Sequence, residues 1–239
     1  MKKDWQIAPK IEEKILKKYP EYNRVILQLL FNRGFEAKKD IEFFFNGSYA
    51  DAHDPFKFNN MKAAVDLAIK HIKEKNKILV YGDYDADGVT ASATLVETLK
   101  TLKAGVDVYI PFRTTEGYGM NKKALDEAKE KGAKLIITVD TGIRNKAEVD
   151  YAKELGLEVI ITDHHAAPDD KNDWPKCIII NPSLPVEKYP FKFLAGVGVA
   201  LNWRWRSSAR PNSIKKIRKN WKTGFWIWSL SGQLPIALY

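Results

Sequence analysis

The pattern of apolar and polar residues predicts helices over the first 75 residues. Apolar residues recur at helical spacing from Ile11 to Tyr19, which Pro20 stops, and again from Val25 to Phe31. A further helix is predicted to begin after Asn60, which stands at its N-cap position. The apolar residues of that helix share one face: Met61, Ala64, Val65, Ala68, Ile69 and Ile72. We therefore expect residues 1–75 to form a helical N-terminal segment that packs on the core.

From residue 77 the pattern changes to short apolar runs that alternate with amphipathic stretches. The apolar runs predict strands at Ile78–Tyr81, Val106–Ile110, Leu135–Val139, Glu158–Thr162 and Cys177–Ile180. The amphipathic stretches predict helices at about Val89–Leu102, Lys122–Lys131 and Asn145–Leu155. Continuous apolar strands that alternate with helices are typical of a parallel sheet. The predicted fold class is α/β: a doubly wound, mostly parallel sheet with helices on both faces, over residues 76–200.

Charge divides the chain at about residue 200. The formal net charge is +9, but residues 201–239 contain eight of the 39 Lys and Arg residues and no Asp or Glu. Residues 1–200 contain the remaining 31 basic residues and all 30 acidic residues, so their charges nearly cancel. Five of the seven tryptophans also lie in residues 201–239. The whole-chain charge is therefore weak support for nucleic-acid binding, and the basic, Trp-rich tail needs its own explanation.

Acidic and histidine residues follow three of the predicted strands directly. Asp83, Asp85 and Asp87 come after the first strand, Asp140 after the third, and Asp163-His164-His165 after the fourth. In a doubly wound sheet, ligands bind beyond the carboxyl ends of the strands. These side chains are therefore expected to meet at one edge of the sheet.

The residue types at that edge predict a divalent-cation site. Carboxylates and imidazoles without a thiol favour Mn²⁺ or Mg²⁺ over structural zinc. Four or more such ligands exceed what one ion needs beside its waters, so two ions that share a carboxylate are expected. A pair of ions of this kind activates water for attack on a phosphoryl group. Without metal, the clustered carboxylates would repel one another, and some would stay protonated.

Other readings of the single motifs are possible. Asp83-x-Asp-x-Asp-Gly also opens an EF-hand loop, but the twelfth position is Thr94 instead of Glu, and a strand precedes the loop. Asp140-Thr141-Gly142 alone is compatible with a simple strand-to-helix turn. Gly196-Val197-Gly198 lacks the preceding strand that a dinucleotide site requires. The metal interpretation rests on the convergence of three strand ends.

Four segments resemble successive motifs of the DHH phosphoesterase superfamily. They are VYGDYDADGVT (residues 80–90), TVDTGI (138–143), TDHH (162–165) and LAGVGV (194–199). PFRTTEGYGMN (111–121) is similar to a loop of the RecJ branch. Two upstream segments, Asn32-Arg33-Gly34 and Asp54-Pro55-Phe56, are similar to the N-terminal segment of that branch. The resemblance covers about residues 5–200.

This resemblance implies an exonuclease that degrades single-stranded DNA from 5′ to 3′ with Mn²⁺ or Mg²⁺, in recombination and repair. The positions that match metal ligands are Asp83, Asp85, Asp87, Asp140 and His164. Asp163 and His165 match the rest of the signature, as catalytic residues that contact phosphate or orient ligands. Arg113 and Tyr118 are candidates for substrate contact, although Tyr118 is equally compatible with loop packing.

The resemblance leaves alternatives open. A phosphodiesterase for short oligonucleotides or cyclic dinucleotides and a non-catalytic DNA-binding remnant belong to the same family. A final motif with one more metal-binding Asp and a second domain are not readable, so the activity of this chain is an open question. Codons can be chosen for parts of residues 201–239 such that reading them one base earlier gives an apolar helix and a string that resembles the missing final motif. We interpret this tail as a frameshift product, which sequencing the gene would test; its rival is an authentic DNA-binding tail.

Two further expectations come from composition. The single cysteine, Cys177, permits no internal disulfide and is predicted to be a small core residue. No apolar run is long enough to span a bilayer, and no signal peptide is readable at the N-terminus. We therefore expect a cytoplasmic protein without a membrane partner; any repair-protein partners cannot be read from the sequence.

Overall fold

The computed structural model describes residues 6–47 and 52–207, with side chains described as far as residue 203. The chain divides into two compact units, residues 1–51 and residues 52–239. The predicted boundary at residue 75 is therefore too late. The reason is that the helix after Asn60 contributes Met61, Ala64 and Val65 to the same core as the sheet, so it belongs to the second unit.

The first unit contains three helices among its described residues: α1 (Glu13–Lys18), α2 (Arg24–Phe31) and α3 (Lys38–Asn46). The side chain of Asn23 accepts a hydrogen bond from the Val25 amide and caps α2. The small core of the first unit consists of Tyr19, Leu27, Leu30 and Ile41. Helices α1 and α2 were predicted from the apolar pattern of the sequence, and α3 was not.

The second unit is built on a five-stranded parallel sheet, which confirms the predicted α/β class. The strands are β1 (Lys77–Tyr81), β2 (Gly105–Tyr109), β3 (Ala133–Val139), β4 (Glu158–Thr162) and β5 (Ile178–Ile180). Their order in the sheet is β2-β1-β3-β4-β5. The direction of winding therefore reverses between β1 and β3, where an open α/β sheet forms its binding crevice.

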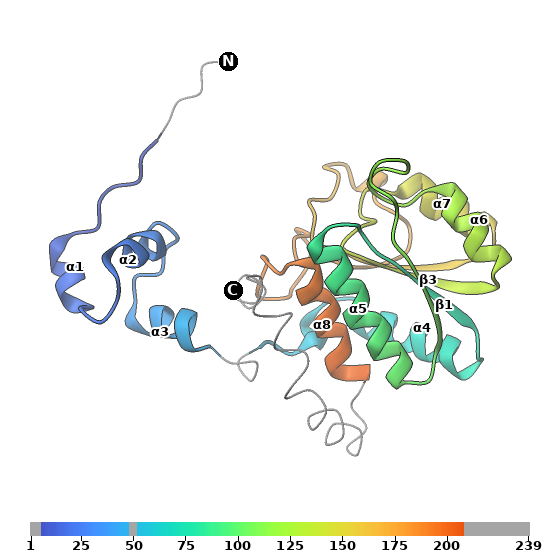
Figure 1. Cartoon of the computed structure of the whole chain (residues 1–239), viewed down its shortest axis with the longest axis horizontal. Helices are drawn as coiled ribbons and strands as arrows, with labels where there is room; N and C mark the ends of the chain where they lie inside the picture. The colour runs from blue at the N-terminus through green and yellow to red at the C-terminus, as the bar shows by residue number, and fades with distance from the viewer. Residues whose placement is uncertain (1–5, 48–51, 208–239) are drawn as a thin grey trace. The chain divides into compact units, whose positions relative to one another are not determined.

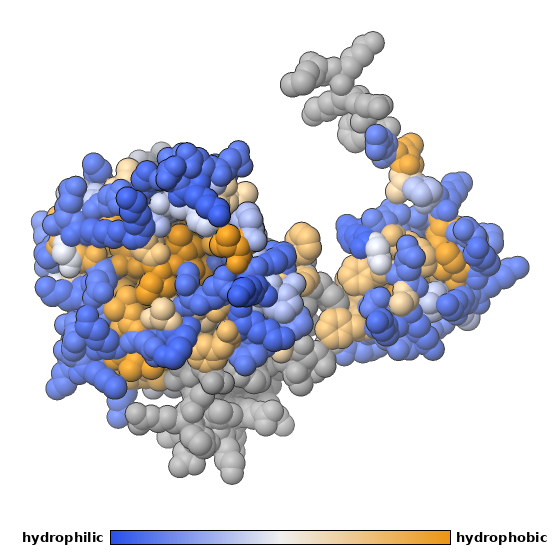
Figure 2. Space-filling view, turned by 180° about the vertical axis from the view of Figure 1, so that it is seen from behind, coloured by the Kyte–Doolittle hydropathy of each residue, from blue (hydrophilic) through white to orange (hydrophobic). Residues whose placement is uncertain are grey.

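Helices cover both faces of this sheet (Figure 1). One face carries α4 (Met61–Lys73), α5 (Ala86–Thr101) and α8 (Gly196–Ser207), and the other carries α6 (Lys122–Glu130) and α7 (Lys146–Glu154). Two short 3₁₀ turns, η2 (Pro55–Lys57) and η3 (Lys171–Asp173), lie in the connections. A view from behind shows hydrophilic residues over most of the visible surface of the second unit, with apolar residues gathered across its middle (Figure 2).

The core of the second unit consists of two apolar clusters, one on each face of the sheet. Ile78, Val80 and Ile137 point towards α4, α5 and α8, while Leu79 and Ile136 point towards α6 and α7. Strands buried on both faces explain why their sequences are continuously apolar. Cys177 packs against the second cluster as predicted, and burial raises the pKa of its thiol to about 12.

Three details differ from the sequence-based expectation. Asn60 occupies the N-cap position of α4, but its side chain does not cap the helix. Its side-chain nitrogen Nδ2 instead donates to the Ile179 carbonyl at 3.0 Å and connects the start of α4 to β5. Helix α5 begins at Ala86, three residues before the predicted start, because Asp85 caps it. Helix α8 was not predicted; it runs past residue 200, and Trp203 is buried in the core.

The remaining part of the tail, residues 208–239, lies outside the described residues. The frameshift hypothesis for it stays a prediction. Within the described part of the chain, no helix combines the length and the apolar character needed to cross a membrane.

Candidate metal centre

The first carboxylates of the site come from the turn between β1 and α5. Asp83 is buried, and its Oδ1 atom has no hydrogen-bond partner. Asp85 is exposed and caps α5, with Oδ1 accepting from the Gly88 amide at 2.9 Å. The turn is tight, because a Cβ atom at Gly88 would lie 2.6 Å from the Cβ atom of Asp83. Glycine at this position therefore allows the first turn of α5 to pack closely against Asp83.

Asp140 follows β3 and has an unusual backbone conformation. Its φ angle is +60°, in the left-handed region that residues other than glycine rarely adopt. Its side chain is 1% exposed, and Oδ1 has no hydrogen-bond donor, although Nε2 of His164 lies 3.0 Å away outside hydrogen-bonding geometry. The neighbouring Thr141 hydroxyl is also buried without a partner. A strained, buried and unsatisfied carboxylate of this kind is expected at a functional site.

Asp163 organises the loop that follows β4. Its side chain is fully buried, and Oδ2 accepts from the Ile143 amide at 3.0 Å. Oδ1 accepts from the amides of His164 at 2.7 Å and His165 at 3.1 Å, and from Nδ1 of His165 at 2.7 Å. Burial by itself would raise the pKa of Asp163, but the donors from His165 and Ile143 outweigh it and lower the pKa. Asp163 thus holds the two histidines in place as a carboxylate.

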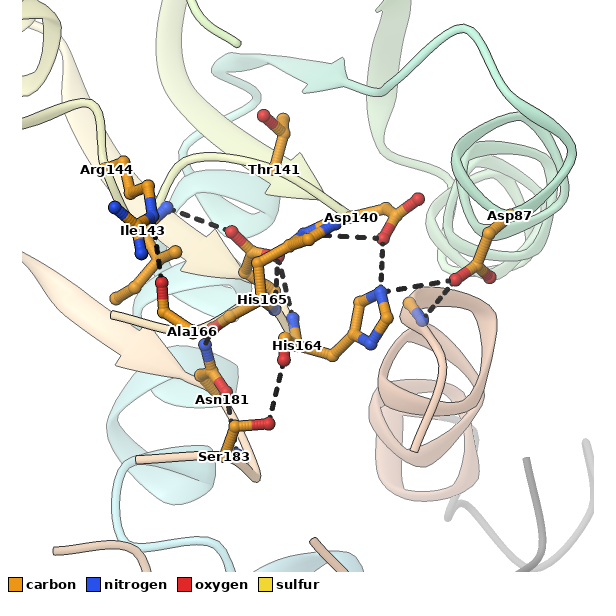
Figure 3. Close-up of polar contacts among 12 residues, drawn as sticks. Asp87, Asp140, Thr141, Ile143, Arg144, His164, His165, Ala166, Asn181 and Ser183 are labelled. Atoms are coloured by element: carbon orange, nitrogen blue, oxygen red, sulfur yellow. Dashed lines mark hydrogen bonds and ion pairs between the residues drawn. The ribbon is translucent and has the colours of Figure 1, made fainter. Parts of the chain in front are cut away.

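His164 and His165 point to different partners (Figure 3). Nε2 of His164 lies between Asp140 and Asp87, 3.0 Å from Oδ1 of the first and 3.6 Å from Oδ2 of the second. Nδ1 of His165 is engaged by Asp163 and also lies 3.2 Å from the Tyr118 hydroxyl. The side chains that converge on the edge of the sheet therefore come from β1, β3 and β4, as the sequence predicted.

Two groups of these side chains have a spacing that suits a cation. Asp83, Asp85 and Asp140 offer one oxygen each within 4.8 Å of one another, and Asp140, His164 and His165 offer ligand atoms at the same spacing. Asp140 is common to both groups. Asp87 is in neither group, but its Oδ2 lies 3.6 Å from Nε2 of His164, the same nitrogen that Asp140 approaches. If each group holds one cation, the two cations share the Asp140 carboxylate.

The raised pKa values of Asp83 and Asp140 follow from burial more than from repulsion between carboxylates. Burial raises the pKa of Asp140 to about 6, and the nearby Asp87 charge adds to this effect. Burial also raises the pKa of Asp83, with a smaller contribution from Asp85. The carboxylates of Asp140 and Asp163 raise the pKa values of His164 and His165 respectively, against the effect of burial. Each of these two carboxylates therefore favours the charged form of the histidine beside it.

The two predicted substrate-contact residues lie at the rim. Tyr118 is 48% exposed, and its ring makes an edge-to-face contact with the His165 ring. Burial of its hydroxyl, followed by the charge of Asp163, raises the pKa of Tyr118. Arg113 is exposed, and its guanidinium lies 5.4 Å from the centre of the Tyr84 ring. Arg113 therefore leaves its donors available, while Tyr118 is tied to the site through His165.

Three polar residues that were not predicted from the sequence hold the backbone of the histidine loop. The buried Asn181 donates to the His165 carbonyl at 2.9 Å, and the Ser183 hydroxyl donates to the His164 carbonyl at 2.8 Å. Nε of Arg144 donates to the Ala166 carbonyl at 3.0 Å. Asn181 and Ser183 directly follow β5, so the rule that pointed to the other strand ends would have found them.

Removing the Asp163 carboxylate is expected to destabilise the protein. Asp163→Ala leaves the buried amide of Ile143 and the partly buried amides of His164 and His165 without an acceptor, at about 1–3 kcal/mol for each unsatisfied group. We expect the free energy of unfolding in urea to fall by at least about 3 kcal/mol in metal-free buffer. Asp169→Ala, at an exposed carboxylate, is the control and should change it by less than about 0.5 kcal/mol. A loss below about 1 kcal/mol for Asp163→Ala would contradict this account of the loop.

The fold and the site together define the class of protein. It is an α/β protein with a cluster of carboxylates and imidazoles at the switch point of a parallel sheet, a site suited to paired divalent cations. The chain belongs to the DHH family, because the model of the DHH family N-terminal domain matches residues 77–223.

Individual relatives agree with this assignment. The chain is 45% identical over 198 residues to the single-stranded-DNA-specific exonuclease RecJ of Bacillus subtilis, a match that covers 82% of this chain and 25% of the relative. A crystal structure of exonuclease RecJ bound to manganese matches with a TM-score of 0.55 and 37% identity, over 61% of this chain and 36% of the other. A crystal structure of RecJ of Thermus thermophilus in complex with Mn²⁺ matches with a TM-score of 0.59 and 28% identity, over 83% of this chain and 27% of the other. This chain is thus of the RecJ type, and it spans about a quarter of the length of the curated relatives it matches.

Proposed function

We propose that the second unit is the metal-binding domain of a phosphodiesterase that hydrolyses single-stranded DNA from the 5′ end, in recombination and repair. The observation that carries this proposal is the position of Asp140, whose carboxylate belongs to both candidate cation groups. The relatives support the substrate class, since those at 45% and 38% identity are named single-stranded-DNA-specific exonucleases. A cytoplasmic location stays a prediction.

The donor set fits Mn²⁺ or Mg²⁺. Its members are carboxylate oxygens and imidazoles, the ligands these ions take in proteins, and no thiol lies among them. The buried Oδ1 atoms of Asp83 and Asp140 have no hydrogen-bond partner, so they are available to a cation. We assign Asp83, Asp85, Asp140 and His164 as ligands, together with Asp87, which lies beside Nε2 of His164. When bound, two such cations supply an activated water and stabilise charge on a phosphoryl oxygen.

The other residues of the site bind and orient. Asp163 fixes the ring of His165 through the contact at 2.7 Å, so that its remaining edge is available to a phosphate. The Tyr118 hydroxyl, 3.2 Å from His165, lies where it can contact the same group. Arg113 offers a cation at the rim for the phosphate backbone of the strand. These assignments describe a site that recognises phosphate by charge and hydrogen bonds and leaves the bases unread.

Metal binding by this chain is the direct test. We expect electron paramagnetic resonance titration to count two Mn²⁺ ions for each chain. Asp140→Ala should remove both ions, because it deletes the shared ligand, and Asp169→Ala should keep both. A chain that binds no Mn²⁺ would contradict the proposal.

Turnover is measured as Mn²⁺-dependent release of nucleotides from single strands with a free 5′ end. Asp140→Ala should abolish the release, and a double-stranded substrate should be degraded more slowly. Preferential cleavage of a short or cyclic dinucleotide would instead assign the site to small substrates. Because this chain spans about a quarter of its relatives, the same substitution in a full-length relative is the matched measurement of activity.

A further inference from the structure

The amino end of α8 reaches into the site from a distant part of the chain. The Gly196 amide donates to Oδ2 of Asp87 at 2.7 Å, and the Val197 amide donates to Oδ1 at 2.8 Å. The first amides of a helix have no partner within the helix, and the helix dipole favours a negative charge there. Both oxygens of Asp87 are thereby fixed by α8, although the two segments lie 109 residues apart.

Gly196 also touches the shared carboxylate. A Cβ atom at Gly196 would lie 2.6 Å from both Cβ and Oδ1 of Asp140, closer than real Cβ atoms approach other atoms. Asp140 is 1% exposed and lies at a strand end with a constrained backbone, so it has little freedom to retreat. Glycine at position 196 is therefore a requirement of space.

One residue thus adjoins both carboxylates that lie near Nε2 of His164. Asp87 and Asp140 approach Nε2 of His164 to 3.6 Å and 3.0 Å from different directions. Gly196 holds the first carboxylate by its amide and borders the second by its Cα. The separation of the two carboxylates is consequently set by how closely α8 docks, and α8 packs along α5, which carries Asp87 (Figure 1).

We propose that Gly196, with the amino end of α8, is the positioning element of the metal site. It contacts no cation itself; it fixes Asp87 against Asp140 so that both can face one ion. This inference rests on the proposed metal site, and it adds that α8 must be docked for the site to bind tightly. Partners of ligands in this position commonly change metal affinity by about 10–100-fold when they are altered.

The test is the Mn²⁺ affinity of the full chain with alanine at position 196. We expect Gly196→Ala to weaken Mn²⁺ binding at least about tenfold, because the new methyl group pushes α8 away from Asp140. Gly105→Ala is the matched control, since a Cβ atom there meets nothing within 4 Å, and its affinity should stay within about twofold of the wild type. Far-UV circular dichroism and the midpoint of urea unfolding establish that each variant is folded.

The outcomes separate the two proposals. Absence of Mn²⁺ binding by the wild type would overturn the metal site and this inference together. Wild-type binding with an equal affinity for a folded Gly196→Ala variant would overturn the inference alone. If Gly196→Ala does not fold, hydrogen exchange of the wild type decides: amides at residues 196 and 197 should exchange more slowly in Mn²⁺ than in EDTA. Exchange at an equal rate would overturn the positioning role.

Discussion

Replacing Asp140 with asparagine is expected to make the metal-free protein more stable at neutral pH. Burial raises the pKa of Asp140 to about 6, so the folded state resists its ionisation. The stabilisation that the protonated group provides is complete below the ordinary pKa near 3.8 and is lost as the pH rises through about 6. Asparagine keeps the shape, removes the charge and tolerates a positive φ angle. The expected gain at pH 7.5 is about 1–3 kcal/mol.

The contributions of His164 and His165 to folding stability fall as the pH rises, as the contribution of Asp140 does. The contribution of Asp163 instead falls as the pH is lowered. His164 and His165 have raised pKa values, so their contribution to stability is also lost as the pH rises above their ordinary value. Asp163 has a lowered pKa, so its contribution is lost only as the pH falls through the acid range. Between about pH 4 and pH 7 the site should therefore destabilise the metal-free wild type as the pH increases.

Urea unfolding in EDTA at pH 5.0 and pH 7.5 measures this effect. At pH 7.5 the Asp140→Asn variant should have a larger free energy of unfolding than the wild type. At pH 5.0 this difference should be smaller. Adding Mn²⁺ should reverse the order, because a ligand that binds only the folded state stabilises only the protein that binds it. Asp169→Asn, an exposed change, should follow the wild type. A variant less stable than the wild type in EDTA at pH 7.5 would refute the argument.

The second large effect is expected from alanine at position 88. A Cβ atom there would lie 2.6 Å from both Cβ and the carbonyl oxygen of Asp83, and backbone atoms cannot move aside cheaply. We expect Gly88→Ala to lower the free energy of unfolding by at least about 3 kcal/mol, or to prevent folding, because the turn between β1 and α5 must open.

Gly105→Ala again provides the comparison, because it adds the same methyl group where space is open. Its free energy of unfolding should stay within about 1 kcal/mol of the wild type. Thermal unfolding of both variants, followed by circular dichroism, gives the difference. Equal midpoints for the two variants would show that the turn is more adaptable than its contacts imply.

Much of the sheet and the site was predictable, because both follow from local pattern. A strand such as Leu135–Val139 is apolar at every position but one since both of its faces are covered, and that pattern is visible in the sequence. The meeting of Asp83, Asp140 and His164 followed from one rule about the carboxyl ends of parallel strands. Neither step required a contact between particular distant side chains.

What escaped prediction depends on such contacts. The role of Asp163 as an acceptor of buried amides arises from the path of the loop around it, which no spacing in the sequence reports. Gly196 could be recognised as part of a motif, but its contact with Asp87 spans 109 residues. Asn60 stood in a capping position and formed a bond to β5 instead, because tertiary contact competed with the local preference.

The arrangement of the site also sets an order of events in the life of the chain. The carboxylates and imidazoles become neighbours only when β1, β3 and β4 lie side by side, and α8 adds its amides from still further along. A ribosome-bound chain that has emerged only as far as α6 carries Asp83, Asp85 and Asp87 but not their partners. Any cation held there must therefore be acquired after the sheet has assembled, so uptake of the ion would report completed folding.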